Sequence, residues 1–191
     1  MAAFSRIKIA GMNPAPHLVL VGPMGAGKTS IGRKLADRMG LPFTDVDEEI
    51  ERRAGTRVST IFDCEGEAGF RARERDLLAE VLSGPGRVIA TGGGAVLAED
   101  NRRLLCTRGF VVHLQVSVDH QLQRLSRDRT RPLLQRDDRE AVLHALAAER
   151  AGLYAGVADL VFATDGMSAS EAASALGRVL GDAWQRNEAA A

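Results

Sequence analysis

A glycine-rich segment near the start of the chain has the residue types and spacing of a phosphate-binding loop. Residues 22–29 read GPMGAGKT and match the pattern G-x-x-x-x-G-K-S/T. Glycines let the backbone turn its N–H groups toward phosphate oxygens. In this pattern the lysine reaches the β- and γ-phosphates of a nucleotide, and the Ser/Thr hydroxyl can bind Mg²⁺. The segment therefore predicts ATP binding with Mg²⁺ as cofactor, through Gly25, Ala26, Gly27, Lys28, Thr29 and Ser30.

Two carboxylates follow a short apolar segment, where a phosphate acceptor could bind. Asp45 and Asp47 lie in the sequence FTDVD at residues 43–47. Residues two apart on an extended chain face the same way. One of the two carboxylates can orient metal-bound water, and the other can accept a proton from a hydroxyl. From the residues alone an alternative stays open, in which both acids only cap the helix that begins there.

Three consecutive glycines, Gly92–Gly94, follow another apolar segment. Backbone without side chains can approach a ligand closely, although the same run could be a flexible turn. The segment before it, Ile89-Ala90-Thr91, lacks the acidic residue that holds the metal in many P-loop proteins. We therefore expect Thr29, water and Asp45 to hold Mg²⁺.

Short apolar segments that alternate with helical ones must position these residues. The expected strands are 17–21, 41–44, 87–90, 110–116 and 160–163, and the expected helices are 30–39, 46–54, 59–63, 67–82, 99–106, 117–125, 137–154 and 168–185. Expected caps are Ser117 and the pairs Asp137 with Glu140 and Ser168 with Glu171. This alternation predicts an α/β fold with helices on both faces of a five-stranded parallel sheet, whose ligands bind beyond the carboxyl ends of the strands.

The length of 191 residues fits one domain, which we place at residues 17–185 with flexible termini at 1–16 and 186–191. Residues 126–138 are dense in charge and contain a proline, so we expect an exposed lid there. Lys+Arg and Asp+Glu both number 25, which argues against a broad basic surface for nucleic acid.

The two cysteines lack metal-site spacing and are typical of a reducing compartment. No apolar run approaches the ~18 residues that span a bilayer, and residues 1–16 lack the apolar core of a signal peptide. These features lead us to expect a cytoplasmic protein without a membrane partner, acting as a monomer.

In order and spacing, these motifs together resemble the shikimate kinase family over about residues 17–165. The resemblance rests on the P-loop, the F-x-D-x-D segment at 43–47, Ile61-Phe62, Gly66-Glu67, Phe70-Arg71, Thr91-Gly92-Gly93-Gly94-Ala95, Arg131-Pro132-Leu133-Leu134 and Arg150 before Leu153-Tyr154. It implies a P-loop fold similar to nucleoside monophosphate kinases, with a lid at 126–138 and a shikimate-binding subregion at 46–74.

The implied reaction is transfer of phosphate from ATP to the 3-hydroxyl of shikimate, on the route to chorismate and the aromatic amino acids. By resemblance, Asp47 holds the ring hydroxyls and can act as base, while Arg71 and Arg150 bind the carboxylate through their planar guanidinium groups. Gly93 and Gly94 would lie against the ring.

The resemblance also places catalytic and nucleotide-binding arginines. Arg131 would move from the lid onto the transferred phosphate, together with Lys28. Arg124 would stack near adenine, with Thr164-Asp165 in the adenine loop. Phe62 and Phe70 could form an apolar wall of the site or pack in the core.

Two other functions remain open on the residues alone. The first is another small-molecule kinase of the same fold, such as a gluconate kinase or a nucleoside monophosphate kinase. The second is a P-loop module that binds nucleotide for regulation or assembly. The acceptor residues favour a carboxylated polyol over a nucleotide, and a regulatory module would not need them.

Overall fold

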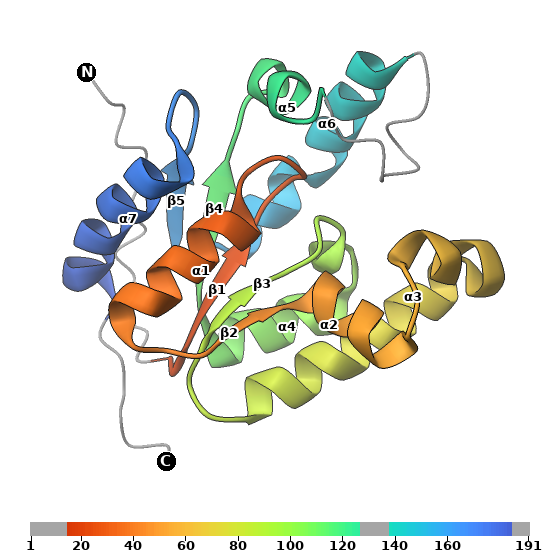
Figure 1. The fold of residues 1–191 in the computed structure, drawn as a ribbon, viewed down its shortest axis with the longest axis horizontal. Coiled ribbons are helices and arrows are strands. Elements are labelled where there is room, and N and C mark those ends of the chain that lie inside the picture. Colours follow the sequence, from red (N-terminus) through yellow and green to blue (C-terminus); the bar gives the residue numbers. More distant parts are fainter. Residues whose placement is uncertain (1–14, 127–137, 185–191) are drawn as a thin grey trace.

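The computed structural model describes residues 15–126 and 138–184, which form a parallel sheet with helices on both faces (Figure 1). The strands are β1 (His17–Val21), β2 (Phe43–Asp45), β3 (Val88–Ala90), β4 (Gly109–Gln115) and β5 (Leu160–Ala163). The helices are α1 (Lys28–Met39), α2 (Val46–Ala54), α3 (Val58–Ser83), α4 (Glu99–Arg108), α5 (Val118–Arg124), α6 (Arg139–Val157) and α7 (Ala169–Ala183), with a short 3₁₀ helix η1 (Ala95–Leu97).

The strands lie in the order β2-β3-β1-β4-β5, and every neighbouring pair is parallel. This confirms the predicted five-stranded parallel α/β fold. The carboxyl ends of β1, β2 and β3 therefore meet at one edge of the sheet. The P-loop, Asp45 with Asp47, and the three glycines follow those three ends directly, so the topology alone brings the predicted motifs together.

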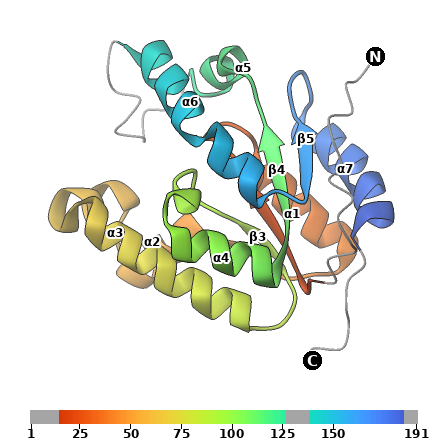
Figure 2. The same ribbon diagram turned by 180° about the vertical axis from the view of Figure 1, so that it is seen from behind.

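Alternate residues of the central strand β1 pack into two different cores, because successive side chains point to opposite faces. Leu18 and Leu20 join the core beneath α1 and α7. Val19 and Val21 join the core beneath α2, α3, α4 and α6. Figures 1 and 2 show these two layers of helices on opposite sides of the sheet. Burial on both faces explains why the strand reads as an uninterrupted apolar run.

The two helices expected at 59–63 and 67–82 form one bent element, α3. Gly66 interrupts its helical backbone with φ 71° and ψ −179°, so the predicted break lies where it was expected. A positive φ is accessible to glycine at little cost. Residues Val58 and Ser83 extend the two halves beyond the predicted limits.

Several predicted ends move by a few residues. β2 covers Phe43–Asp45 rather than 41–44, and α6 begins at Arg139 and continues to Val157. Asp138 precedes α6 without a side-chain cap bond, and Asp137 lies outside the described residues. The caps at Ser117 and at Ser168 with Glu171 are confirmed, the latter as a complete capping box.

Trp184 packs the end of the described chain against its beginning. Its indole Nε1 donates a hydrogen bond of 2.9 Å to the carbonyl of Ala15. Ala15, which we expected within the flexible terminus, is 4% exposed and belongs to the core under α1 and α7. No helix in the part of the chain that the structure describes is long and apolar enough to cross a membrane.

Candidate active site

The P-loop connects the end of β1 to the first turn of α1, and two of its glycines are required by geometry. Gly22 has φ 144°, and a Cβ added there would collide with the carbonyl oxygen of Leu114. Gly27, the N-cap of α1, has φ 90°. Most side chains disfavour both conformations. The loop therefore ends at a helix N-terminus, whose N–H groups and dipole favour an anion.

Lys28 lies folded back over this loop. Its Nζ donates hydrogen bonds to the carbonyl oxygens of Gly22 at 2.7 Å and Pro23 at 2.9 Å. The two carbonyl oxygens thus accept hydrogen bonds from the ammonium group inside the loop that is expected to bind phosphate. A bound triphosphate would offer stronger, charged acceptors to the same donors.

Thr29 and Asp45 join the P-loop to the end of β2. The Thr29 hydroxyl donates to Asp45 Oδ2 at 2.6 Å. The other oxygen, Oδ1, accepts from the backbone N–H groups of Asp47 and Glu48 at 3.0 and 3.2 Å. Asp45 is therefore the N-cap of α2, as the open alternative held for it, and it also binds the P-loop hydroxyl. Asp47 is not the N-cap residue. Its backbone N–H donates to the capping carboxylate of Asp45.

The oxygen donors at this point fit Mg²⁺, which prefers hard oxygen ligands and retains several waters. Thr29 supplies a hydroxyl and Asp45 a carboxylate, and the phosphates bind in the adjoining loop. Among residues 15–126 and 138–184, no three His, Cys, Asp or Glu side chains could together hold a metal ion. A magnesium ion held here would therefore take most of its ligands from nucleotide and water.

Gly92 brings two carboxylates together at the end of β3. A Cβ added to Gly92 would lie 2.8 Å from Asp47 Oδ1 and 2.8 Å from Glu74 Oε1. Glu74 is fully buried, and burial raises the pKa of its carboxyl group; Arg71 opposes this rise and the charge of Asp47 adds to it. The space beside this glycine is therefore polar and is bordered by two carboxyl groups. Any substitution of Gly92 would fill it.

Arg71 faces the third glycine of the turn, because a Cβ on Gly94 would overlap its guanidinium group. Its Nη1 donates to Glu74 Oε2 at 2.7 Å, and its Nε and Nη2 donate to Glu67 at 3.2 and 3.1 Å. Glu67 and Glu74 lie on the same helix as Arg71 and hold the guanidinium plane in place. We did not single out Glu74 from the sequence.

Arg150 and Tyr154 approach the same turn from α6. Arg150 Nη1 donates to the carbonyl of Gly93 at 3.3 Å, and the Tyr154 hydroxyl donates to that oxygen at 2.6 Å. Burial raises the pKa of Tyr154 to about 12, so its hydroxyl keeps its proton at neutral pH. Tyr154 is a second site residue without an assigned role in the sequence analysis, and it stacks on His113 with ring centroids 4.9 Å apart.

Arg124 connects the P-loop to the segment between β5 and α7. Its Nη1 donates to the carbonyl of Gly25 at 2.9 Å and to Thr164 Oγ1 at 3.1 Å. Its Nη2 donates to the carbonyl oxygens of Thr164 and Met167. The structure thus brings together Arg124, the P-loop and the segment expected to surround adenine.

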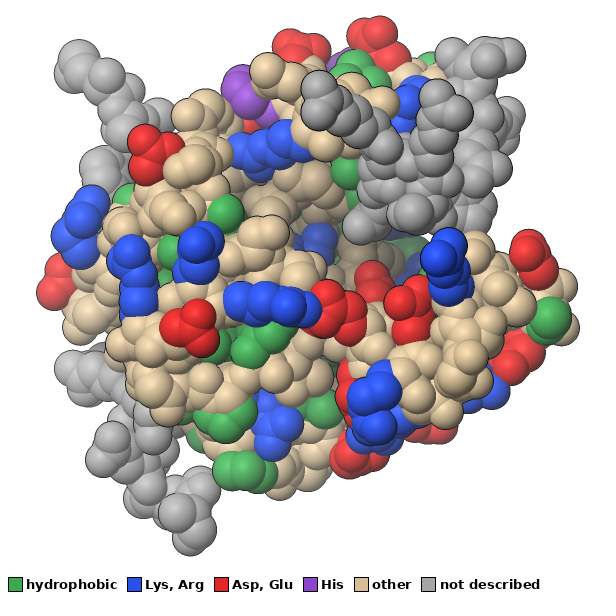
Figure 3. Space-filling model, viewed as in Figure 1, with side chains coloured by type: hydrophobic (Ala, Val, Ile, Leu, Met, Phe, Trp, Pro, Cys, Tyr) green, Lys and Arg blue, Asp and Glu red, His purple; other side chains and the backbone are tan. Residues whose placement is uncertain are grey.

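Arg131 and most of the expected lid lie outside the described residues. Phe62 and Phe70 contact each other, with ring centroids 4.8 Å apart; Phe70 belongs to the core under α3, and the partly buried Phe62 packs against that core. Phe70 also carries the Arg71 guanidinium over its ring at 5.3 Å. The space-filling view shows charged side chains of both signs around a hollow beside α3 (Figure 3).

Comparison with known proteins shows which family the chain resembles. The family model described as "Shikimate kinase" matches residues 24–180. The chain belongs to the shikimate kinase family. A shikimate kinase from Stenotrophomonas maltophilia is 57% identical over 93% of the chain and 98% of that protein. Another from Xanthomonas oryzae pv. oryzae is 55% identical over 94% of the chain and 100% of its own length.

Solved shikimate kinases share the fold. The structure of "Shikimate kinase from Acinetobacter baumannii in complex with shikimate" is 46% identical, with a TM-score of 0.83 over 88% of this chain and 94% of that one. A shikimate kinase from Aquifex aeolicus is 30% identical, with a TM-score of 0.74 over 88% of this chain and 99% of that chain. The chain is thus a member of a kinase family over nearly its whole length.

Proposed function

We propose that this kinase transfers the γ-phosphoryl group of ATP to the 3-hydroxyl of shikimate, giving ADP and shikimate 3-phosphate on the route to chorismate. One observation carries the proposal. The carboxylate of Asp47 and the guanidinium groups of Arg71 and Arg150 converge on the glycine turn after β3, beside the P-loop after β1. The related Acinetobacter baumannii enzyme is described in complex with shikimate, which supports the same acceptor here.

Arg71 and Arg150 would bind the shikimate carboxylate. Each is partly withdrawn from water, with 22% and 13% of the side chain exposed. Glu74 and Glu67 hold Arg71, while Arg150 bonds the carbonyl of Gly93. Guanidinium groups fixed in this way lose little further freedom when a carboxylate binds, so more of the interaction energy appears as affinity.

Asp47 would bind the acceptor hydroxyl. A carboxylate within hydrogen-bond reach gives the hydroxyl proton a destination. Phosphoryl transfer has a loose transition state, so aligning the oxygen with the γ-phosphorus matters as much as removing its proton.

Lys28 would exchange its two loop carbonyls for the β- and γ-phosphate oxygens. Its charge stabilises the negative charge that develops on the transferred group. Thr29 and Asp45 would hold Mg²⁺, Asp45 through water; the ion neutralises phosphate charge when bound. Arg131 would add a second positive charge from the lid, and Arg124 would border the adenine. All these residues come from one chain, which is compatible with a monomer.

A coupled assay of ADP release tests the acceptor. We expect turnover with shikimate well above the background without acceptor, and none above background with gluconate or AMP. Identification of the product by mass and ³¹P NMR would locate the phosphate on the 3-hydroxyl. Turnover with gluconate but not shikimate would overturn the proposal and favour the rival small-molecule kinase.

A further inference from the structure

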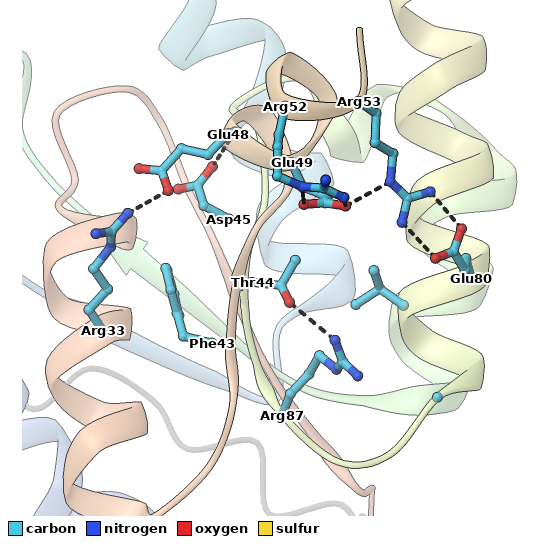
Figure 4. A pocket seen from close by; sticks show the side chains of 12 residues that line it. Arg33, Phe43, Thr44, Asp45, Glu48, Glu49, Arg52, Arg53, Glu80 and Arg87 are labelled. Atoms are coloured by element: carbon cyan, nitrogen blue, oxygen red, sulfur yellow. Dashed lines mark hydrogen bonds and ion pairs between the residues drawn. The ribbon is translucent and has the colours of Figure 1, made fainter. Parts of the chain in front are cut away.

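A cavity of about 570 Å³ opens beside β2, the edge strand of the sheet (Figure 4). α1 forms one wall, and α2 with the end of α3 forms the other. Its volume is in the range of sites that bind small organic molecules. Of the residues assigned above to ATP, metal or acceptor, only Asp45 lines it; the full lining is Arg33, Phe43, Thr44, Asp45, Glu48, Glu49, Arg52, Arg53, Glu80, Val81, Gly84 and Arg87.

Three of the four arginines in this lining are paired with carboxylates. Arg33 forms an ion pair with Glu48 on the side of α1. On the side of α2, Arg52 and Arg53 share Glu49, each at 2.7 Å. Arg53 also binds Glu80 of α3 at 2.6 Å. These pairs, drawn as dashed lines in Figure 4, compensate most of the charge in the cavity wall.

Arg87 differs from the other three. Its Nη1 donates to the Thr44 hydroxyl at 3.3 Å, and its Nε donates to the carbonyl of Pro85 at 3.2 Å. Both acceptors are neutral, and Nη2 lies against Gly84, where an added Cβ would be 3.5 Å away. The charge of Arg87 contributes to lowering the pKa of Glu80, but the oxygens of Glu80 bond to Arg53.

A partly buried guanidinium group that bonds only neutral oxygens retains its charge and its planar donor edge for an anion. Such an anion would meet apolar surface as well as charge. The Phe43 ring and the Val81 side chain line the same cavity. The guanidinium carbon of Arg33 lies over the Phe43 ring, 5.5 Å from its centroid. The Arg33 side chain therefore covers part of this ring on the side of α1.

We propose that this cavity binds a small organic oxyanion, a carboxylate or phosphate ester with an apolar body, and that Arg87 anchors the oxyanion. The site is separate from those for ATP and the acceptor, which lie at the P-loop and at the turn after β3. Asp45 borders both regions, since it lines the cavity and accepts the Thr29 hydroxyl. A ligand in the cavity would therefore touch the strand end that carries the metal-binding carboxylate.

Fluorine NMR titration with 4-fluorobenzoate and 4-fluorophenyl phosphate tests the site. The full chain is first saturated with ADP, Mg²⁺ and shikimate, so that the P-loop and the acceptor arginines are filled. We expect at least one probe to bind with a millimolar or lower dissociation constant. The probe that binds more tightly identifies the preferred oxyanion as carboxylate or phosphate.

Two variants locate the binding. Arg87→Gln should weaken it about tenfold or more, because one charge-assisted contact is lost. Gly84→Asp should weaken it similarly while Arg87 is retained, because the new carboxylate would lie against Nη2; Gly84 has φ −87°, which accepts a side chain. Gly84→Asn is its uncharged control. Arg103→Gln, at a side chain 72% exposed on α4, is the surface control.

Melting temperature and the circular dichroism spectrum establish that each variant is folded. The expected result is weaker binding by Arg87→Gln and Gly84→Asp, with normal binding by Gly84→Asn and Arg103→Gln. Equal affinity of Arg87→Gln and the unaltered protein would overturn the proposal. So would the failure of both probes to bind at 10 millimolar, roughly the weakest affinity that such contacts would give. The comparison between variants measures binding of the probe and not turnover, so it does not depend on which acceptor the active site phosphorylates.

Discussion

The Thr29 hydroxyl donates a hydrogen bond of 2.6 Å to Asp45 Oδ2, and thereby ties the first turn of α1 to the end of β2. The same carboxylate caps α2 through its other oxygen. Asp45 therefore has two separable tasks, one in stability and one at the proposed metal site. A pair of substitutions distinguishes them.

Asp45→Asn should raise the Mg²⁺ concentration needed for half-maximal activity while hardly changing the free energy of unfolding. Asn is as good an N-cap as Asp but has no charge for the metal. Asp45→Ala removes the cap too and should cost about 1 kcal/mol of stability. Activity against Mg²⁺ concentration and urea unfolding measure the two effects. An unchanged Mg²⁺ dependence in Asp45→Asn would exclude the metal-binding role of Asp45 and leave only its role as a helix cap.

Asp47→Asn should lower kcat by about 10²–10⁴-fold, the usual contribution of general acid–base catalysis. The amide keeps the shape of the carboxylate but cannot accept the proton. Nucleotide affinity should stay normal, since the cradle follows another strand. Stability should not fall, because the charge of Asp47 contributes to the unfavourable ionisation of Glu74. Single-turnover kinetics, ADP titration and urea unfolding test this; a fully active but destabilised variant would contradict the catalytic role.

Lys28→Ala should abolish measurable phosphoryl transfer in a folded protein. The variant loses the charge that stabilises the transferred group and keeps the glycine backbone of the cradle. Activity in the coupled assay and the circular dichroism spectrum are the measurements. Near-normal turnover by the folded variant would contradict the assigned role of the P-loop in phosphoryl transfer.

Arg71→Lys and Arg150→Lys should each weaken shikimate binding about 10- to 100-fold, although both keep the positive charge. An ammonium group cannot reproduce the paired hydrogen bonds of a guanidinium, and a lost charge-assisted bond costs about 1.5–3 kcal/mol. Calorimetric titration measures the affinity. Arg73→Lys is a matched control on the same helix, because Arg73 is 44% exposed and pairs with Glu65. Equal affinities in all three variants would exclude the carboxylate clamp.

His113 should make the protein sensitive to acid. Burial, and then the charge of Lys28, lower the pKa of His113 from 6.5 to about 4. Between pH 6.5 and pH 4, His113 is therefore protonated in the unfolded chain but stays neutral in the folded protein. The free energy of unfolding then falls as the pH falls. The loss attributable to this residue is about 3 kcal/mol between pH 7 and pH 4.

His113→Phe keeps a ring beside Tyr154 but cannot be protonated. Urea unfolding at a series of pH values should show a weaker loss of stability in acid for this variant than for the unaltered protein. Some acid sensitivity should remain, because burial also lowers the pKa of His17. The exposed His144, with 63% of its side chain accessible, provides the control variant His144→Gln. Parallel curves for all three proteins would contradict the assignment.

Local signals in the sequence were sufficient for the P-loop and the five strands. A strand that is buried on both faces of the sheet appears in the sequence as an apolar run flanked by glycine. This pattern can be recognised from the run itself, without knowing which distant segments pack against it. The two roles of Asp45 were harder to separate, because a carboxylate before a helix is equally typical of a cap and of a ligand. The structure shows that this carboxyl group caps α2 and also accepts the Thr29 hydroxyl, while its role at the metal stays a prediction.

Glu74 and Tyr154 could not be assigned a role from composition or periodicity. A glutamate on a charged helix ordinarily faces water, whereas Glu74 is fully buried against the turn after β3. One available signal was its position three residues after Arg71, a spacing at which side chains meet on a helix. Tyr154 has the analogous relation to Arg150, four residues before it. The deciding contact with Gly93 joins segments 61 positions apart.

The two hydrogen bonds that Lys28 makes within its own loop bear on how quickly nucleotide can enter. An empty cradle of backbone donors and an ammonium group would repel itself, and the carbonyls of Gly22 and Pro23 act as internal substitutes for phosphate. Arrival of ATP would then exchange one set of acceptors for another around a loop whose glycine turns are already formed. Within the P-loop, the Lys28 side chain would rotate from these carbonyls to the phosphates. The P-loop itself should therefore add no slow ordering phase to nucleotide binding, and its part of the association rate should be governed by diffusion and by the charge of the nucleotide.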